Sequence, residues 1–179
     1  MDIRRVVTGH DSAGKAVFSS DEMVAPAEPM LMPGAAFHRL WGSDTAPNFP
    51  DDGSQPAHHQ YFPPVGGFRF GLFTLPPATS AAPADLDIMA AMADAEEKLP
   101  GMLGHMEPDA PGMHTTATVD FEYVLSGEVF LELDNGAEVH LRPGDTVVQN
   151  GTRHAWHNRG TVPCTMVLFC AGAHHRNVG

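Results

Sequence analysis

Short strand-like segments separated by sharp turns fill the chain from residue 113 to residue 171, and this pattern constrains the fold more than any other feature. One turn contains Asn135-Gly136, a pair that supplies the positive φ angles of a two-residue hairpin. Another turn contains Pro143-Gly144. Five or six short strands at regular spacing predict an all-β barrel or sandwich that closes on itself.

Many prolines interrupt the first hundred residues, so only short elements are expected there. Residues 4–8 and 15–19 predict a small hairpin, and residues 37–41 and 68–75 predict two further strands. The segment 42–66 is predicted to be a surface loop. Because the apolar segments are too short to fold alone, we expect them to wrap around and extend the C-terminal core.

One helix is predicted near residues 85–99, where an amphipathic pattern ends at Pro100. At 179 residues the chain is long enough to bury one core. We predict an irregular N-terminal extension over residues 1–100, whose short strands and single helix pack on the barrel. A barrel core over residues 101–173 and a C-terminal tail over residues 174–179 complete the chain.

The charge and the cysteines of the chain exclude several classes of protein. The chain has 22 acidic and 10 basic residues, a net charge of −12, and no cluster of Lys or Arg, so nucleic-acid binding is not expected. No segment approaches the roughly 20 apolar residues of a membrane span. In a strand, about 3.3 Å per residue separates Cys164 from Cys170 by roughly 20 Å, too far for a disulfide. We therefore expect a soluble cytoplasmic protein.

Two motifs near the ends of the strand series carry potential metal ligands. The first contains His114, Thr116 and Asp120, and the second contains Gln149 and His154. This stretch resembles the two signature motifs of the cupins, small β-barrels also called double-stranded β-helices. In this chain Thr116 replaces the second His of the family motif, Asp120 replaces its Glu, and Gln149 occupies the position of its proline. The resemblance implies a jelly-roll barrel of the conserved cupin 2 type, with an N-terminal extension similar to those of small bacterial single-domain cupins.

An inward-facing site follows from the alternation of side chains along a strand. His114, Thr116, Asp120 and Glu122 would share one face, and a buried polar row is costly unless water, a metal or a substrate satisfies it. His114, His154 and Asp120 would then form a two-imidazole, one-carboxylate set that leaves coordination positions open on one divalent Fe, Mn, Ni or Zn ion. Glu122 is the alternative carboxylate ligand.

The remaining predicted site residues would act on the substrate. Glu122 or a metal-bound hydroxide is the expected proton-transfer group. Thr116 and Gln149 are expected to position the substrate, although Gln149 is equally consistent with a polar residue at a strand end. Three aromatic residues are predicted to wall the substrate pocket: Tyr123, Phe130 and Trp156.

Three functions remain open. The first is a metal-dependent enzyme that acts on a small organic acid or an oxygenated metabolite by lyase chemistry, such as decarboxylation or dehydration. The second is an Fe(II)-dependent dioxygenase. The third is a non-catalytic barrel that binds a small ligand, because Thr116 could abolish metal binding. The resemblance to cupins, which commonly pair through strand exchange, implies a homodimer in each case, with the hairpin at residues 4–19 as the element exchanged between copies.

Overall fold

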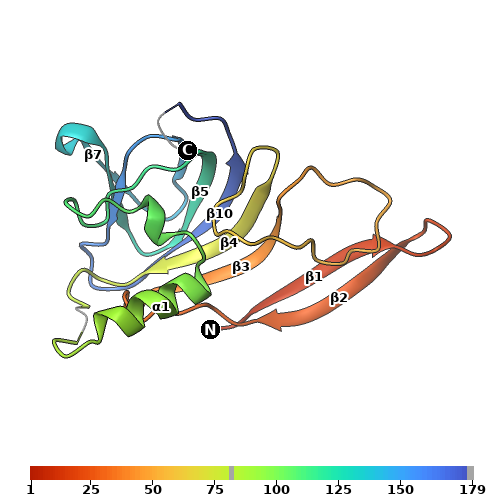
Figure 1. The fold of residues 1–179 in the computed structure, drawn as a ribbon, viewed down its shortest axis with the longest axis horizontal. Helices are drawn as coiled ribbons and strands as arrows, with labels where there is room; N and C mark the ends of the chain where they lie inside the picture. The colour runs from red at the N-terminus through yellow and green to blue at the C-terminus, as the bar shows by residue number, and fades with distance from the viewer. Residues whose placement is uncertain (81–82, 177–179) are drawn as a thin grey trace.

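A computed structural model describes residues 1–80 and 83–176, and its strands form three antiparallel sheets (Figure 1). The largest sheet consists, in spatial order, of β3 (Ala36–Ser43), β4 (Phe68–Leu75), β10 (Cys164–Gly172), β5 (Thr118–Ser126) and β8 (Thr146–Asn150). A second sheet consists of β7 (Glu138–Leu141), β6 (Val129–Glu132) and β9 (Ala155–His157).

The hydrophobic core lies between these two sheets. Phe37, Phe73 and Met166 come from the five-stranded sheet, and Val129 and Leu131 come from the three-stranded sheet. Each of these side chains is almost completely buried, because the inner faces of the two sheets pack against each other. The prediction of an all-β jelly-roll barrel is confirmed.

The hairpin between β6 and β7 forms at the predicted place but is longer than a two-residue turn. A short 3-10 turn, η2 (Asp134–Gly136), connects the strands, and the Leu133 N–H donates to the Ala137 carbonyl at 2.8 Å. Asn135 and Gly136 have positive φ angles of 61° and 70°. The pair therefore supplies the backbone conformation for which its sequence is typical.

The N-terminal strands divide between two sheets. β1 (Ile3–His10) and β2 (Ala16–Val24) form the predicted hairpin, a separate two-stranded sheet that extends away from the barrel (Figure 1). β3 and β4 instead join the barrel, because β4 pairs with β10 along its whole length. β3 and β4 thus extend the barrel sheet, whereas the β1–β2 hairpin does not. The boundaries between extension, core and tail stay a prediction.

The predicted helix is α1 (Ile88–Lys98). Asp87 caps its first turn by accepting a hydrogen bond from the Ala90 N–H, and Ala91 and Ala95 form its buried face. A second, short helical element, η1, covers residues Leu103–His105. Within residues 1–80 and 83–176, neither kind of helix is long and apolar enough to cross a membrane.

The segment 42–66 is more than the predicted surface loop. Its last residues return to the barrel, where the Tyr61 N–H donates to the Pro100 carbonyl at 2.8 Å. Tyr61 and Phe62 pack against the hydrophobic core. The prediction failed because these aromatic side chains lie in an irregular segment, which has no periodic pattern to indicate burial.

Strand β5 has its polar residues on the inside and its aromatic residues on the outside. Thr118, Asp120 and Glu122 are buried, whereas Phe121 and Tyr123 are exposed. Alternation along a strand predicts this division of side chains, but soluble sheets usually bury the apolar set. The inverted pattern directs two carboxylates into the barrel.

Candidate functional site

The structure brings His114 and His154 together. The two residues form an isolated antiparallel bridge in which each backbone N–H donates to the other residue's carbonyl, at 2.9 and 3.0 Å. Their ring centroids lie 4.1 Å apart. Two segments that are separated by 40 positions in the sequence therefore present their imidazoles to the same space.

Hydrogen bonds to backbone carbonyls define the tautomer of both rings. His114 Nδ1 lies 3.0 Å from the Gly112 carbonyl oxygen, and His154 Nδ1 lies 2.8 Å from that of Thr152. Burial lowers the pKa of both imidazoles, and burial together with the nearby His114 lowers the pKa of His154 to about 4. Because a carbonyl can only accept, Nδ1 carries the proton in each neutral ring, and Nε2 is left as the acceptor or metal-binding atom.

Asp120 and Glu122 line the same cavity as the two imidazoles. Asp120 Oδ1 and Glu122 Oε2 are buried and have no hydrogen-bond partner among the described residues. Burial raises the pKa of Asp120, although hydrogen bonds from Thr118 and Cys170 oppose the shift. Burial and the charge of Asp120 raise the pKa of Glu122 to about 8. Such buried, unpaired carboxyl oxygens are typical of ligand sites.

The rest of the cavity is apolar. It has a volume of about 190 Å³, and its wall consists largely of aromatic, Met and Leu side chains, among them Phe37, Tyr61, Phe73, Met102, Trp156 and Leu168. Trp156 meets the His154 ring edge-on at a centroid distance of 5.9 Å. The site therefore combines a polar end with a mainly hydrocarbon wall.

Two of the three predicted wall residues lie elsewhere, and this corrects the sequence analysis. Tyr123 is 43% exposed, because the alternation along β5 places it on the face opposite Glu122. Phe130 on β6 stacks on His140, its partner on β7, at a centroid distance of 4.3 Å. Neither lines the cavity, whereas Trp156 does.

Thr116 and Gln149 are buried but do not line the cavity either. The hydroxyl of Thr116 shares a 2.8 Å hydrogen bond with that of Thr118, and the Gln149 amide donates to the Thr152 carbonyl at 3.2 Å. Both side chains satisfy their polar groups within the protein. The structure thus places both residues outside the lining of the cavity.

Several cavity residues were missed by the sequence analysis. Tyr61 and Phe62 come from the segment predicted as a surface loop, and Met102 and Met106 come from the segment around η1. Cys170 pairs directly with Asp120 across β10 and β5. The alternation of side chains along β10 could have indicated that Cys170 faces the cavity. For the other residues, only the folded chain shows that they lie at the cavity.

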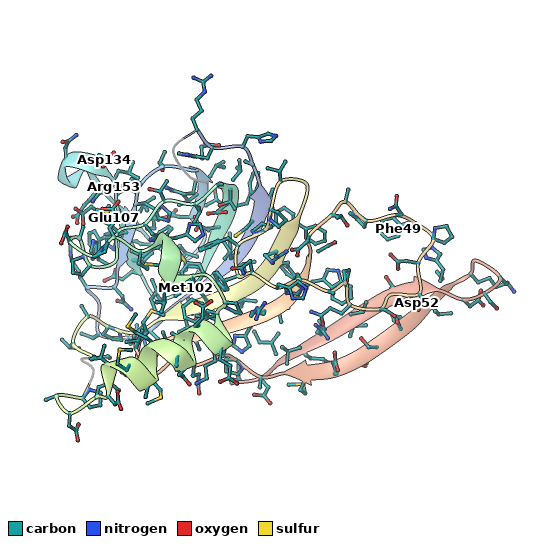
Figure 2. The ribbon with its side chains drawn as sticks, in the orientation of Figure 1. Phe49, Asp52, Met102, Glu107, Asp134 and Arg153 are labelled. Carbon is teal, nitrogen blue, oxygen red and sulfur yellow. The ribbon has the colours of Figure 1, made fainter. Side chains whose placement is uncertain are left out.

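The segment that carries Met102 and Met106 is fastened to the barrel by an arginine. Arg153 Nε and Nη2 donate to the two carboxylate oxygens of Glu107, each at 2.7 Å, and Nη1 donates to Asp134 at 3.0 Å (Figure 2). This bidentate ion pair holds one wall of the cavity against the residue that precedes His154.

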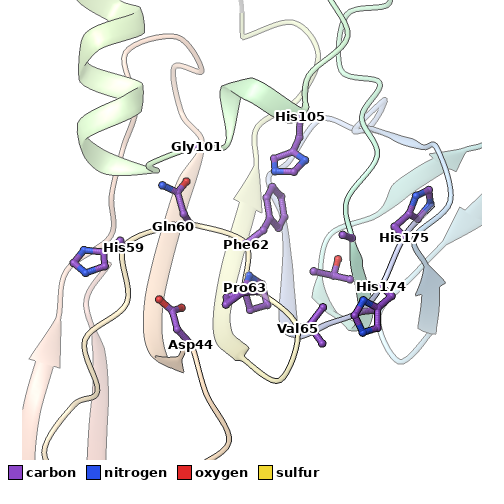
Figure 3. A pocket seen from close by; sticks show the side chains of 14 residues that line it. Asp44, His59, Gln60, Phe62, Pro63, Val65, Gly101, His105, His174 and His175 are labelled. Atoms are coloured by element: carbon purple, nitrogen blue, oxygen red, sulfur yellow. The ribbon is translucent and has the colours of Figure 1, made fainter. Parts of the chain in front are cut away.

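A second, larger groove of about 600 Å³ adjoins the site, because Phe62 lines both spaces (Figure 3). Its lining includes four histidines: His59, His105, His174 and His175. His105 contacts the Phe62 ring edge-on at a centroid distance of 5.0 Å, and its Nδ1 bonds to the Thr115 carbonyl. Phe62 thus contributes to the walls of both the groove and the cavity.

The donor types at the cavity fit a divalent transition metal, but the donors are not preassembled. Two imidazole Nε2 atoms and an unpaired buried carboxylate oxygen are suitable ligands. Among the described residues, however, the group of three whose ligand atoms all lie within 4.8 Å is Glu132, Glu138 and His157, on the other sheet. There His157 bonds to Glu132 at 2.6 Å, and Glu138 pairs with Arg159, so those carboxylates already have partners.

Comparisons with known proteins agree with this geometry. The family model described as "Cupin domain" matches residues 102–170. The chain is 28% identical over 167 residues to phomopsin biosynthesis cluster protein C' of Diaporthe leptostromiformis, covering 92% of this chain and 75% of that protein. It is 26% identical over 177 residues to the cupin-domain-containing oxidoreductase fogC of Aspergillus ruber, covering 92% and 70%.

Other matches are shorter or more distant. Oryzines biosynthesis cluster protein J of Aspergillus oryzae is 39% identical over 61 residues, which is 34% of either chain. The crystal structure of a predicted oxalate decarboxylase from Thermotoga maritima has a TM-score of 0.46 at 18% identity, covering 83% of this chain and 93% of that one. The sequence relatives named above are fungal, so the resemblance to small bacterial cupins is not confirmed. The match to the cupin domain model is limited to residues 102–170, the segment that contains both motifs.

Proposed function

We propose that this chain is a metal-dependent cupin enzyme that acts on a small oxygenated organic molecule. The observation that carries the proposal is the polar end of the cavity, where His114 and His154 meet beside two carboxyl oxygens that lack partners. Unpaired polar groups in an apolar cavity cost free energy, so a protein that keeps them is expected to use them on a ligand.

His114 and His154 would hold the metal through Nε2, and Asp120 or Glu122 would supply the carboxylate. Fe, Mn, Ni and Zn all accept such a donor set. When bound, a metal of this kind polarises a substrate oxygen and, in the case of iron, also supports redox chemistry. The backbone carbonyls that accept from both Nδ1 atoms keep the rings in the tautomer that ligation requires.

The remaining residues of the cavity would bind and orient the substrate. Glu122 lines the cavity and its Oε2 has no hydrogen-bond partner among the described residues, so it would exchange a proton with a bound molecule. Trp156 and Phe73, whose ring centroids are 6.2 Å apart, form part of the apolar wall and would exclude water from the reacting end.

Two reaction classes remain. The relatives named as cupin-domain-containing oxidoreductases favour a redox reaction, of which an Fe(II)-dependent dioxygenation is one form. The unpaired Glu122 favours lyase chemistry, such as dehydration or decarboxylation, in which a proton moves without net oxidation. Oxygen consumption by the Fe(II)-loaded protein in the presence of substrate would favour the first class, and turnover without oxygen would favour the second.

Metal binding is the first test. Protein purified without chelator, or refilled anaerobically with Fe(II), Mn(II), Ni(II) or Zn(II), is expected to retain about one equivalent of metal by mass spectrometry of the elements. Less than about a tenth of an equivalent of every metal after refilling would contradict the proposal and leave a non-catalytic ligand-binding barrel.

We also propose that the chain forms a homodimer. Phe70, Phe121 and Phe169 form an exposed row across the outer face of the five-stranded sheet, since Phe169 pairs in register with both of the others. The β1–β2 hairpin forms a sheet of its own within the described chain and contacts β3 through side chains such as Arg5, which donates to the Leu40 carbonyl at 2.7 Å. Its outer strand edges are available to a second copy. An apolar patch of this kind on a soluble protein is typical of an interface.

A further inference from the structure

The polar end of the cavity is rich in acceptors and lacks cations. The Nε2 atoms of His114 and His154 accept, and so do the unpaired carboxyl oxygens of Asp120 and Glu122. None of the described residues that line the cavity is Lys or Arg. A ligand is therefore recognised here by hydrogen-bond donors and not by a negative charge.

The arginines on the neighbouring strands are engaged elsewhere. Arg69 on β4 donates to Asp44 and to backbone carbonyls, including that of Ser43 at 2.9 Å. Arg39 on β3 donates through Nη1 to the Lys98 carbonyl at 3.4 Å. Both line a small adjoining space of about 20 Å³, which shares Phe37, Tyr61, Leu168 and Cys170 with the main cavity. Neither lines the main cavity itself, and their guanidinium groups donate to oxygens outside it.

The size and wall of the cavity limit the ligand further. A dry apolar cavity of about 150 Å³ binds benzene, so the volume of about 190 Å³ here suits one six-membered ring with one or two small substituents. The wall offers the faces and edges of Phe37, Phe73 and Trp156, and aromatic rings pack well against such groups.

We propose that the substrate is an uncharged, single-ring aromatic compound that carries at least one hydroxyl group. The ring would lie against the aromatic wall, and the hydroxyl would donate to Asp120, Glu122 or an imidazole Nε2. This inference rests on the proposed function of the cavity and narrows it, because it excludes the small organic acids that the sequence had left open.

A bound metal does not change the conclusion. A bound divalent ion would favour the loss of the protons of Asp120 and Glu122, and the two carboxylates would then balance its charge. The carboxylate of a substrate would then add a negative charge that no described side chain of the cavity neutralises. Burying an unpaired charge in an apolar site is far more costly than burying a hydroxyl that donates to an acceptor.

The test compares two ligands that differ in charge and little in shape. Isothermal titration of the whole protein with 3-hydroxybenzyl alcohol and with 3-hydroxybenzoate is performed on metal-free and on Zn(II)-loaded samples. We expect the alcohol to bind at least about tenfold more tightly in both samples. Equal or tighter binding of the benzoate would overturn the inference, and so would the failure of the alcohol to bind below about 10 mM.

Isosteric variants locate the selectivity. Asp120→Asn and Glu122→Gln each replace an ionisable carboxyl group by a neutral amide of nearly the same shape, so both are expected to reduce the preference for the alcohol by at least about threefold in the Zn(II)-loaded protein. Glu132→Gln, on the other sheet, is the matched control and should leave the preference unchanged. An unchanged preference in both cavity variants would contradict the role assigned to the carboxyl groups.

The outcome is distinguishable from a failure of the proposed function. If no metal binds but the preference for the alcohol persists, the metal-dependent enzyme is wrong and the ligand class stands. If a metal binds and the benzoate is preferred, the enzyme stands and the ligand class is wrong.

Discussion

The inner and outer faces of the five-stranded sheet reverse the distribution of side chains that is usual in a soluble barrel. On the inner face, β5 contributes Asp120 and Glu122, which are 4% and 5% exposed. On the outer face, Phe121 and Phe169 are 47% and 38% exposed and touch across β5 and β10. Each face therefore presents groups that the isolated chain leaves unsatisfied.

The comparison teaches that both faces are suited to binding, but to different partners. Buried carboxyl groups are tolerated when a ligand or metal completes them, and exposed aromatic rows are tolerated when another surface covers them. Stability alone explains neither face. A chain with the aromatic side chains inside and the carboxyl groups outside would bury more apolar surface and would be expected to be more stable. The predictions below test the two faces separately.

The largest effect is expected from the imidazoles on the inner side. His114→Ala and His154→Ala should each weaken metal binding by at least about 100-fold, because each removes one of the few donors to the ion. Titration followed by mass spectrometry of the elements measures the loss. His157→Ala is the control. His157 lies on β9, the strand that begins directly after His154, and this variant should bind metal as the wild type does. Comparable weakening in the control would place the metal at the Glu132 cluster instead.

The outer face should control assembly. Phe121→Asp combined with Phe169→Asp introduces charge into the exposed aromatic row, and we expect the dimer dissociation constant to rise by at least about 100-fold. Light scattering at micromolar concentration measures the mass. Val139→Asp, at an exposed position of β7, is the control and should remain dimeric. A monomeric wild-type protein would refute the homodimer.

On the inner face, removing a carboxyl group should increase stability while abolishing function. In the metal-free protein, Glu122→Leu is expected to raise the free energy of unfolding by about 1–3 kcal/mol, because a buried polar group without a partner is replaced by an apolar one. Chemical denaturation measures the change. Glu132→Leu, which breaks a bond to His157, should not stabilise the protein.

The same carboxyl group predicts a pH dependence. Burial in the folded protein raises the pKa of Glu122 from 4.5 to about 8. Between these pH values the folded state therefore binds a proton that the unfolded state does not. Stability of the metal-free wild type should therefore fall as the pH rises from about 4.5 to about 8. In Glu122→Gln this slope should be smaller, and an identical slope in the two proteins would contradict the shift.

The smallest effect is expected at the edge of the cavity. Arg153→Lys keeps the charge but loses the bidentate pair with Glu107, and it should weaken ligand binding by only about twofold to fivefold, because exposed ion pairs contribute little. Arg159→Lys, which alters the similar pair with Glu138, is the control and should not change ligand binding. A loss at Arg153 as large as that at His154 would mean that the segment around η1 takes a direct part in binding.

Much of the fold was predictable from local patterns. The Asn135-Gly136 pair identified a hairpin, and alternation along β5 placed Thr118, Asp120 and Glu122 on one face. The spacing of the two motifs indicated that His114 and His154 would approach each other, and they lie in ring contact. Their role as metal ligands stays a prediction.

Other parts of the site could not be predicted from local patterns. Tyr61 belongs to an irregular segment, and Phe130 lies on a strand whose inner face depends on how the second sheet packs. Tyr123 was assigned to the pocket although the alternation already placed it outside. The length of the turn between β6 and β7 was also misjudged. One additional residue in this turn leaves the alternation of the two flanking strands almost unchanged, so the sequence pattern gives no sign of it.

The sequence by itself determined which side chains share a strand face and which backbone positions turn, because strand alternation and the φ preferences of Asn and Gly act over a few residues. Only the tertiary structure decided which face is enclosed, which segments complete the wall, and that Asp120 and Glu122 lie in the cavity without a hydrogen-bond partner for Oδ1 and Oε2. The physical reason is that burial and hydrogen-bond satisfaction depend on neighbours that are distant in the sequence.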